Sequence, residues 1–390
     1  MITVGFTLIG DGKWSGGLNY QRTLLELIAS EFRGRVDACV VVAPEHELIA
    51  NDTFGPYLNR PLLVDRSVAL AGVGGRAFRA ALTGNDKVLA AFVLRHGIDV
   101  MFENARFFGR RFPVPIISWM PDFQHRHLPQ LFTRRAWLKR EVGYRAQTGG
   151  RRVILLSSET ARDDFKAAYP RSRLRTMVAR FSSAIDLDRV LLAAEGMSRK
   201  YELPEHFLFL PNQFWAHKNH RIVLEAVCIV RERRGGLAGF PPVVMSGPTT
   251  DYRDKTLFER TMARAKALEV DSHFLHLGLI PYQDVLALNA ASLAVINPSL
   301  FEGWATSVEE AKSLGTLLLL SDIPVHREQA PGAFFFRPTD AEALARQMMD
   351  VSLATRKLAD KERLVSASAA RKAEFAEAFF RTIEIAASLD

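Results

Sequence analysis

Three charged side chains of this sequence have the types and spacing to bind a phosphorylated, hydroxyl-rich small molecule. Lys218 lies in the segment PNQFWAHKNH, and Glu302 and Glu310 lie in PSLFEGWATSVEEAKSLG, with seven residues between the two acids. A lysine ammonium is a point cation suited to a diphosphate, and carboxylates accept hydrogen bonds from hydroxyl groups. The two carboxylates can bind two hydroxyl-bearing groups that lie several ångströms apart. The amides of a helix N-terminus between these groups can face the phosphates. A ribose and a second sugar joined by a diphosphate match this arrangement.

Glu310 has a structural alternative. The stretch from Ser307 to Glu310 fits the S-x-x-E capping box, in which the glutamate bonds only a backbone amide, and Gly315 would close that helix. Glu302 has no such alternative, because it lies in the loop that follows the apolar run AVIN. Gly303 comes directly after it and lets a ligand approach the backbone.

The loop around Lys218 carries further polar side chains. The amides of Asn212 and Gln213 can bind oxygen atoms from either side, and both follow the apolar run FLFL. Binding is the favoured interpretation, and the alternative is a polar loop that caps the helix beginning near Asn219.

A glycine-rich loop, GDGKWSGG, follows the first apolar run. Gly10 and Gly12 fill two of the three glycine places of a dinucleotide fingerprint, and Ser15 stands at the third, so the loop is weak support for NAD. Gly16 and Gly17 precede a helix that starts at Leu18, where bare amides could approach an anion or a sugar closely. The alternative is simple turn geometry.

Two candidate metal sites are better explained otherwise. Asp186 and Asp188 have the D-x-D spacing, but Asp186 is placed to cap a helix and Asp188 to lie in its first turn. His125 and His127 are joined only by Asp122 among residues at ligand spacing. No metal site is predicted.

A cluster of cations lies between residues 131 and 152. Apolar residues at helical spacing, among them Leu138 and Val142, are interleaved with basic residues and the single acid Glu141. This predicts a basic amphipathic helix that can lie on anionic lipid, and the alternative is a surface helix docked on its own domain. The basic residues are Arg134, Arg135, Lys139, Arg140, Arg145, Arg151 and Arg152.

Alternating apolar runs and helical patterns must position these residues. The runs MITVGFTLIG, DACVVVAP, IDVMFEN, VPIISWMPD and RRVILLSS predict a parallel sheet in the first half, and FLFLPNQ begins a second series. We therefore predict an α/β fold with two Rossmann-like, doubly wound domains that face each other across a cleft, over residues 1–190 and 191–370. A C-terminal helix, residues 371–390, is predicted to pack back towards the N-terminal domain.

Composition bounds the class of protein. The 390 residues carry a net charge of +8 and are 48% hydrophobic, which excludes general disorder and favours an anionic partner. The two cysteines, Cys39 and Cys228, support neither a disulfide framework nor a zinc site. No secretory signal or membrane-spanning run is recognisable, so a cytoplasmic location is predicted. Nucleic acid is disfavoured as a partner, because the basic residues cluster on one helix without a recognition motif.

At this point the sequence resembles a known family. FEGWATSVEEA resembles the E-x7-E segment of GT-B fold glycosyltransferases, family 4 (group 1) in particular. LPNQFWAHKNH and WMPDFQHRHLPQLF are similar to the donor-phosphate loop and the N-domain loop of its bacterial members, and the resemblance covers nearly the whole chain in order.

The resemblance implies roles for individual residues. Glu310 would bind the ribose, Glu302 the donor-sugar hydroxyls and Lys218 the diphosphate, and His125 would face the reacting centre, with Asp122 beside it on the acceptor side. His127 is the alternative to His125. Many members carry an arginine five or six residues before the lysine, where this chain has Gln213 and Asn212. The implied donor-binding residues are Gly16, Gly17, Asn212, Gln213, Lys218, Glu302, Gly303, Thr306, Ser307 and Glu310, and the implied catalytic residues are His125, Lys218 and Glu302.

The implied activity is a retaining, metal-independent transfer from a nucleotide sugar to a glycan or lipid-linked acceptor in bacterial cell-surface polysaccharide synthesis. The nucleotide sugar is a co-substrate, so no cofactor is expected. Attachment to the inner face of the membrane is expected if the basic helix binds lipid. The alternatives are a GT-B fold sugar-nucleotide epimerase and a non-catalytic nucleotide-sugar-binding partner in polysaccharide assembly.

Overall fold

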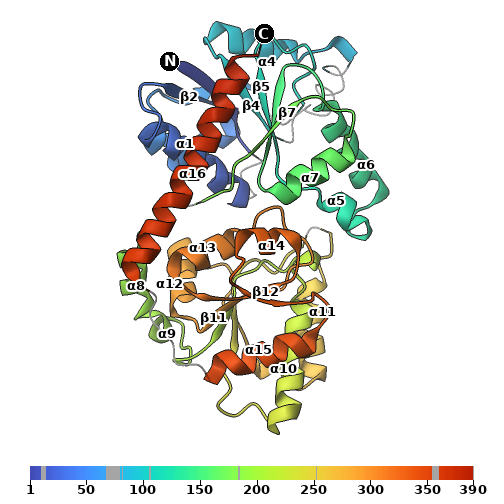
Figure 1. The fold of residues 1–390 in the computed structure, drawn as a ribbon, viewed down its shortest axis with the longest axis vertical. Coiled ribbons are helices and arrows are strands. Elements are labelled where there is room, and N and C mark those ends of the chain that lie inside the picture. The colour runs from blue at the N-terminus through green and yellow to red at the C-terminus, as the bar shows by residue number, and fades with distance from the viewer. Residues whose placement is uncertain are drawn as a thin grey trace. The chain divides into compact units, whose positions relative to one another are not determined.

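A computed structural model of the chain describes residues 1–9, 15–66, 80, 82–104, 107–182, 185–251, 253–353 and 360–389 (Figure 1). Gly10 and Gly12 of the glycine-rich loop lie outside the described residues. The chain divides into two compact units, which are described separately below. Unit 1 comprises Met1–Phe123, Thr133–Phe181 and Ala373–Asp390, and unit 2 comprises Gln124–Phe132 and Ser182–Lys372.

Unit 1 contains a parallel sheet whose described strands have the order β3-β2-β1-β4-β5-β6-β7. Most of these strands are buried along their whole length, as expected for parallel strands covered by helices on both faces. The strands are β1 (Ile2–Thr7), β2 (Val36–Val42), β3 (Leu63–Val64), β4 (Val100–Glu103), β5 (Ile116–Met120), β6 (Arg152–Leu156) and β7 (Arg175–Val178).

The helices of unit 1 connect these strands. A Ser158 side chain that accepts a hydrogen bond from the Ala161 amide caps α7, and Asp86 caps α4 in the same way. The described helices are α1 (Ser15–Ser30), α2 (Glu47–Phe54), α4 (Lys87–Arg95), α6 (Arg134–Ala146) and α7 (Glu159–Ala168), with the 3-10 turns η1 (Pro44–His46) and η2 (Gly55–Tyr57).

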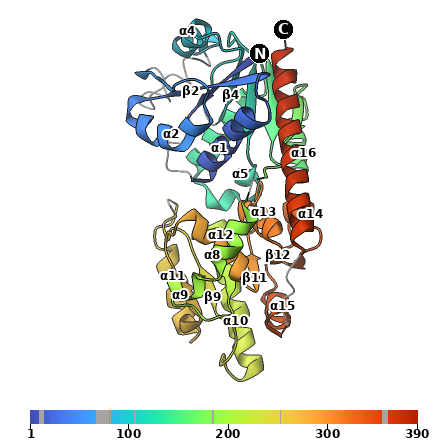
Figure 2. The same ribbon diagram turned by 90° about the vertical axis from the view of Figure 1, so that its left-hand side faces the viewer.

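A long C-terminal helix, α16 (Lys361–Ala387), is divided between the two units, and its buried side chains belong to unit 1. Figure 2 shows it as one unbroken helix. Residues from Ala373 onward belong to unit 1, where Phe379 is fully buried and its ring lies edge-on to Phe102 at 6.4 Å between centroids. Phe375 packs against Tyr20 of α1. Unit 1 therefore takes part of its core from the last residues of the chain.

A fully buried ion pair connects two strands of the sheet of unit 1. Arg152 of β6 pairs with Glu103 of β4 at 2.9 Å, and both side chains have no exposed surface. Arg152 also donates to the Gly109 and Gly149 carbonyl oxygens, at 2.8 and 2.7 Å. Glu103 accepts from the Ser118 hydroxyl. Because these charges are satisfied on all sides, the pair ties two strands to the loops around them.

Unit 2 contains a second parallel sheet, whose described strands have the order β10-β9-β8-β11-β12-β13. Its strands are short and almost wholly apolar, and buried side chains cover both faces. They are β8 (Leu208–Leu210), β9 (Val243–Met245), β10 (Phe274–His276), β11 (Ala294–Asn297), β12 (Leu317–Ser321) and β13 (Phe334–Phe336).

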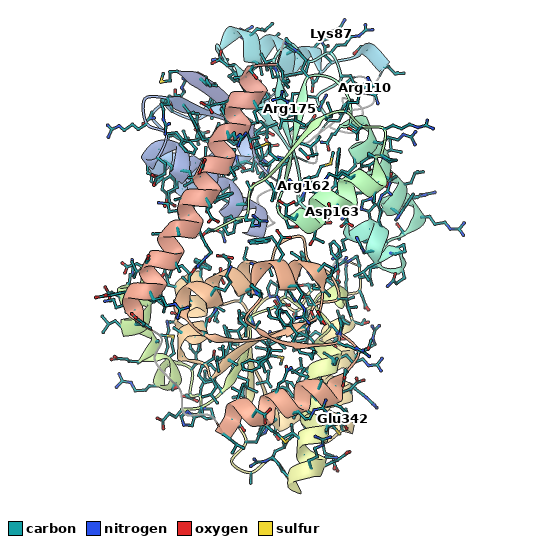
Figure 3. The ribbon with its side chains drawn as sticks, viewed as in Figure 1. Lys87, Arg110, Arg162, Asp163, Arg175 and Glu342 are labelled. Carbon is teal, nitrogen blue, oxygen red and sulfur yellow. The ribbon has the colours of Figure 1, made fainter. Side chains whose placement is uncertain are left out.

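Helices on both faces complete unit 2. Helices α10 and α15 lie side by side, and Glu342, at the start of α15, pairs with Arg233 of α10 (Figure 3). The described helices, besides the first part of α16, are α5 (Gln124–His127), α8 (Leu187–Ala194), α9 (Met197–Lys200), α10 (His220–Arg234), α11 (Leu257–Ala267), α12 (Tyr282–Ala291), α13 (Thr306–Leu314), α14 (Pro324–Gln329) and α15 (Ala341–Leu353), with the turns η4 (Pro129–Leu131), η5 (Ala216–Lys218) and η6 (Asp271–His273).

Candidate functional site

The carboxyl ends of strands β8 and β11 bring two polar loops of unit 2 together. The strands are hydrogen-bonded neighbours and run parallel, so the segments that follow them, residues 211–219 and 298–305, leave the same edge of the sheet. A backbone hydrogen bond from the Leu300 amide to the His217 carbonyl oxygen, at 2.7 Å, joins the loops directly.

Lys218 and Glu302 form the centre of this edge. The Lys218 Nζ atom lies 2.6 Å from Glu302 Oε1, and the two side chains are only 16% and 9% exposed. Ser299 Oγ donates to the same Oε1 atom at 2.6 Å. Glu302 Oε2 has no protein partner within the described residues and can accept a hydrogen bond from a ligand hydroxyl.

The charge of Lys218 keeps Glu302 ionised. Burial alone would raise the pKa of this carboxyl, but the adjacent ammonium and the hydrogen bonds from Lys218 and Ser299 outweigh it and hold the pKa at about 2. The pair is therefore a cation and an anion at neutral pH, fixed in place by their mutual contact.

A hydrogen-bond network of buried neutral side chains holds the Lys218–Glu302 pair in place. Asn297, at the end of β11, accepts from the Ser299 hydroxyl at 2.6 Å and from the Asn212 amide at 3.4 Å, and donates to Ser307 Oγ at 3.3 Å. Asn297 and Ser299 have no exposed surface. This network links the two loops to the first turn of α13 and holds Asn212 inward. Gln213 and Gly303 are half-buried beside it.

Glu310 lies on α13, one turn further from the loop. Its Oε1 accepts a hydrogen bond from the Tyr282 hydroxyl of α12 at 2.9 Å. Burial raises the pKa of Glu310 to about 7, with the nearby Glu309 adding to the rise and the Tyr282 hydrogen bond opposing it. Helix α13 begins at Thr306 with Ala305 at the N-cap, so Ser307 lies inside the helix and the capping-box alternative for Glu310 is wrong. Gly315 does end the helix, with φ +68°.

The N-terminus of α13 keeps its first amides available. Ala305 supplies no side-chain cap; instead Gln329 accepts from the Ala305 amide at 3.2 Å and donates to its carbonyl oxygen at 2.8 Å. The N–H groups of Thr306 and Ser307 have no hydrogen-bond acceptor among the residues that the structure describes. Such amides, at the positive end of a helix, are suited to an anion.

The remaining predicted residues lie elsewhere. Gly16 and Gly17 form the first turn of α1, and Asp122 follows β5, all in unit 1. His125 and His127 belong to the Gln124–Phe132 segment of unit 2, where His125 has no exposed surface. The exposed His127 ring stacks on Phe301 at 4.9 Å between centroids, directly beside Glu302.

Neither metal alternative gains support. Asp186 caps α8 by accepting a hydrogen bond from the Arg189 amide at 3.1 Å, which confirms the capping interpretation of the D-x-D pair. Within the described ranges, no group of three or more histidine, cysteine or acidic side chains is arranged to hold a metal ion.

The basic segment forms α6 only over Arg134–Ala146, so the prediction of a basic helix that includes Arg152 is wrong: Arg152 begins β6 and is buried against Glu103. Two of the predicted apolar positions face outward on α6. Leu138 and Val142 are each 57% exposed, although a docked surface helix would bury such residues. The inward side carries Tyr144, whose hydroxyl donates to the Asp122 carbonyl oxygen at 3.0 Å. The exposed cations of α6 are Arg134, Arg135, Lys139 and Arg145. No helix in the described part of the chain is long and apolar enough to cross a membrane.

Sequence reasoning missed several residues at this edge of the sheet. Asn297 had a usable signal, since it is a polar residue that ends an apolar strand. Tyr282 had none, because nothing in a first helical turn identifies a partner 28 residues away. The same holds for Asp251 and Arg253, in the loop after β9, which contact the segment around His217.

Comparison with known proteins gives one family match and many structural ones. Residues 197–368 match the model of the family described as "Glycosyl transferases group 1". A comparison with curated protein sequences gives no match.

Three solved structures illustrate the structural likeness. A glycosyltransferase from Rickettsia africae ESF-5 has a TM-score of 0.69 at 14% identity, with 98% of each chain covered. The structure described as "Trehalose-6-phosphate from E. coli bound with UDP-2-fluoro glucose" has a TM-score of 0.67 at 12% identity, over 98% of this chain and 99% of that one. WaaG, a glycosyltransferase involved in lipopolysaccharide biosynthesis, has 0.60 at 16%, over 97% and 95%. At these identities the likeness is one of fold.

Proposed function

We propose, on the premise that residues 197–368 match the model of the group 1 glycosyl transferases, that the chain transfers a sugar from a nucleotide sugar to a glycan or lipid-linked acceptor. The two parallel α/β sheets, of the GT-B fold, support this proposal. Transfer with retention of the anomeric configuration, in bacterial cell-surface polysaccharide synthesis, is the specific activity that we infer.

The Lys218–Glu302 ion pair beside the N-terminus of α13 carries this proposal. Lys218 and the amides of Thr306 and Ser307 would stabilise the departing diphosphate, as preorganised charge does in an oxyanion hole. Glu302 Oε2 would accept a hydrogen bond from the donor sugar, and Glu310 one from the ribose. Because Lys218 and the helix amides supply positive charge, we propose a reaction without a divalent metal.

The transfer needs no protein nucleophile in this scheme. The bond from the anomeric carbon to the phosphate oxygen breaks, the acceptor oxygen bonds the same face of that carbon, and the acceptor proton passes to the leaving phosphate. We propose the roles predicted for the remaining residues. Asp122 and His125 would lie on the acceptor side, and Gly16 and Gly17 would bind the donor. A covalent glycosyl adduct on a carboxylate of this protein would contradict the scheme.

The ionisation of Glu310 gives the test of the donor site. With a pKa of about 7, Glu310 is about 90% protonated at pH 6 and about 10% at pH 8. Only the carboxylate offers both oxygens as acceptors to ribose hydroxyls. Affinity for a nucleoside diphosphate should therefore rise with pH, by up to about tenfold between pH 6 and pH 8. Titration calorimetry with UDP, GDP, ADP and CDP at both pH values measures this.

Glu310→Gln is the matched control for that titration. The nucleotide's own phosphate ionisation is common to both proteins, so the part of the pH dependence that belongs to Glu310 should disappear in the variant. The neighbouring acid, Glu309, is paired with Arg371 and Lys312, and the substitution leaves these pairs in place. A glutamine oxygen at position 310 can still accept the Tyr282 hydrogen bond that Glu310 accepts in the wild type. A wild type that binds none of the four nucleotides would show the proposed donor site to be wrong.

We also propose that α6 attaches the protein to an anionic membrane surface from the cytoplasmic side. Two exposed apolar side chains, Leu138 and Val142, lie on the helix face that carries Arg134, Arg135, Lys139 and Arg145. Such a face can insert its apolar residues while its cations contact lipid phosphates. A membrane position would suit a lipid-linked acceptor.

Sedimentation with vesicles that contain anionic lipid tests this attachment. The wild type should bind at low salt and be released at high salt, because salt screens the cations. Exchanging Leu138 and Val142 for glutamate should lower partitioning by about tenfold or more, since it removes apolar insertion and adds repulsion. Leu94→Glu, at a 62% exposed leucine of α4, is the control and should bind as the wild type does. Equal loss in both variants would rule out a specific role of α6.

A further inference from the structure

The loop after β9 carries a buried ion pair that the proposed mechanism does not use. Asp251 has no exposed surface, and the Arg253 side chain is 13% exposed. Arg253 Nε donates to Asp251 Oδ1 at 3.0 Å and Nη2 to Oδ2 at 3.3 Å. The backbone amide of Arg253 also donates to Asp251 Oδ1, at 2.9 Å. This two-pronged contact fixes the plane of the guanidinium group.

The same carboxylate ties the β9 loop to the segment that carries Lys218. Asp251 Oδ2 accepts from the Ala216 amide at 3.2 Å, and the Phe214 amide donates to the Pro248 carbonyl oxygen at 3.1 Å. Strands β9, β8 and β11 are adjacent in the sheet. Arg253, Lys218 and Glu302 therefore come from three neighbouring strand-end loops on one edge.

His217 lies between the two cations. Its Nδ1 is 3.4 Å from Arg253 Nη2, and the next residue in the chain is Lys218. An arginine nitrogen can only donate, so Nδ1 accepts and the imidazole proton is on Nε2. Burial lowers the pKa of His217 to about 3, and the charges of Lys218 and Arg253 add to this effect. The ring is thus neutral at physiological pH and adds no charge to the two permanent cations.

The charges of this edge are arranged as two separate pairs. Lys218 is neutralised by Glu302, and Arg253 by Asp251. A diphosphate carries charge on two phosphoryl groups, whereas the ammonium of Lys218 is a single point charge. A guanidinium group offers a planar fork that matches phosphate oxygens. Asn212 and Gln213, on the loop after β8 that carries Lys218, are neutral amides and cannot supply a second positive charge.

We propose that Arg253 is the second cation of the donor-diphosphate site, acting with Lys218, and that Asp251 is its positioning residue. This inference rests on the proposed function. It assigns to the loop after β9 the second positive charge that many members of the resembled family carry on the loop after β8, where this chain has Asn212 and Gln213. Arg253 contributes to leaving-group stabilisation because charge on the departing phosphate grows in the transition state.

A purely structural role for Arg253 is the rival explanation. Its Nη1 donates to Gln124 Oε1 at 3.3 Å, and its guanidinium carbon lies 5.8 Å from the Phe132 ring centroid and 5.7 Å from that of Trp215. If these contacts are its only purpose, removing the charge should disturb the whole site rather than the phosphate contact alone.

Calorimetric titration of variants separates the two roles. The ligands are the nucleoside diphosphate that binds the wild type and the corresponding nucleoside. Arg253→Gln should weaken diphosphate binding by about tenfold or more and leave nucleoside binding within about twofold of the wild type. Arg253→Lys should recover part of the affinity, and Asp251→Asn should reproduce part of the loss with Arg253 still present. Arg260→Gln, at a 63% exposed arginine of α11, is the control.

These titrations distinguish a wrong assignment of Arg253 from a wrong assignment of the whole donor site. Equal weakening of diphosphate and nucleoside, or unchanged diphosphate affinity in Arg253→Gln, overturns the assignment while the proposed function stands. A wild type that binds no nucleotide overturns both. In turnover assays the inference requires Arg253→Gln to lower kcat at saturating donor, since a ground-state contact alone would raise only KM.

Discussion

Lys218→Met is expected to lower kcat by about 10²–10³-fold, the loss typical of removing one preorganised donor to a developing anion. Lys218 is 2.6 Å from Glu302 and 16% exposed, so its ammonium acts in a largely water-excluded setting where charge is weakly screened. The methionine keeps the length of the side chain but removes the cation. Release of nucleoside diphosphate from the donor, followed under saturating conditions, measures the effect.

Two further variants separate chemistry from folding. Lys218→Met leaves the 9% exposed Glu302 without its counter-ion, which also lowers stability. Adding Glu302→Gln removes that buried charge, and the double variant should recover its thermal midpoint without recovering turnover. Lys255→Met, at an exposed lysine of unit 2, should leave both unchanged. Turnover within tenfold of the wild type in a folded Lys218→Met protein would contradict the assigned role.

Arg152→Met is expected to lower the free energy of unfolding by about 3–5 kcal/mol. The variant leaves the Glu103 carboxylate with no exposed surface and no cation, and frees the Gly109 and Gly149 carbonyl oxygens of their donor. An uncompensated buried charge is among the largest single-residue penalties known. Urea denaturation followed by circular dichroism measures the change.

Arg175→Met provides the matched control, because Arg175 is an exposed arginine on the neighbouring strand β7 (Figure 3). It should change the free energy of unfolding by less than about 0.5 kcal/mol. Replacing Glu103 with leucine as well as Arg152 with methionine should restore part of the loss. A cost below about 1 kcal/mol for Arg152→Met would mean that water reaches the carboxylate.

The alternation of apolar runs and helical patterns sufficed to predict two parallel sheets. Largely apolar strands such as β2 and β11 are buried along their whole length, as parallel strands covered by helices on both faces are. The N-cap at Asp186 was also predictable, because its capping bond to the Arg189 amide involves only four consecutive residues. Which face of α6 turns outward was not predictable, since periodicity gives the spacing of Leu138 and Val142 but not the direction in which they point.

The site residues were predictable only where they lie in local sequence segments with a recognisable pattern. Lys218, Glu302 and Glu310 lie in segments with recognisable spacing, whereas the contacts of Arg253 with His217 depend on β9 and β8 being neighbours. Strand order is a property of the whole sheet and leaves no mark on any local segment. The capping-box interpretation of Glu310 failed because the helix begins at Thr306, which places Ser307 inside it, and because Tyr282, from another helix, binds the carboxylate.

The discontinuous composition of unit 1 has a consequence for biosynthesis. Phe375 and Phe379 of α16 belong to its core, yet they follow all of unit 2 in the chain. A ribosome releases the N-terminal segments long before these two rings emerge. Unit 2, apart from Gln124–Phe132, is one continuous stretch and can complete its fold first. The core of unit 1 can therefore be completed only after Phe375 and Phe379 have been synthesised, so the segments of unit 1 that precede unit 2 stay incompletely packed until then.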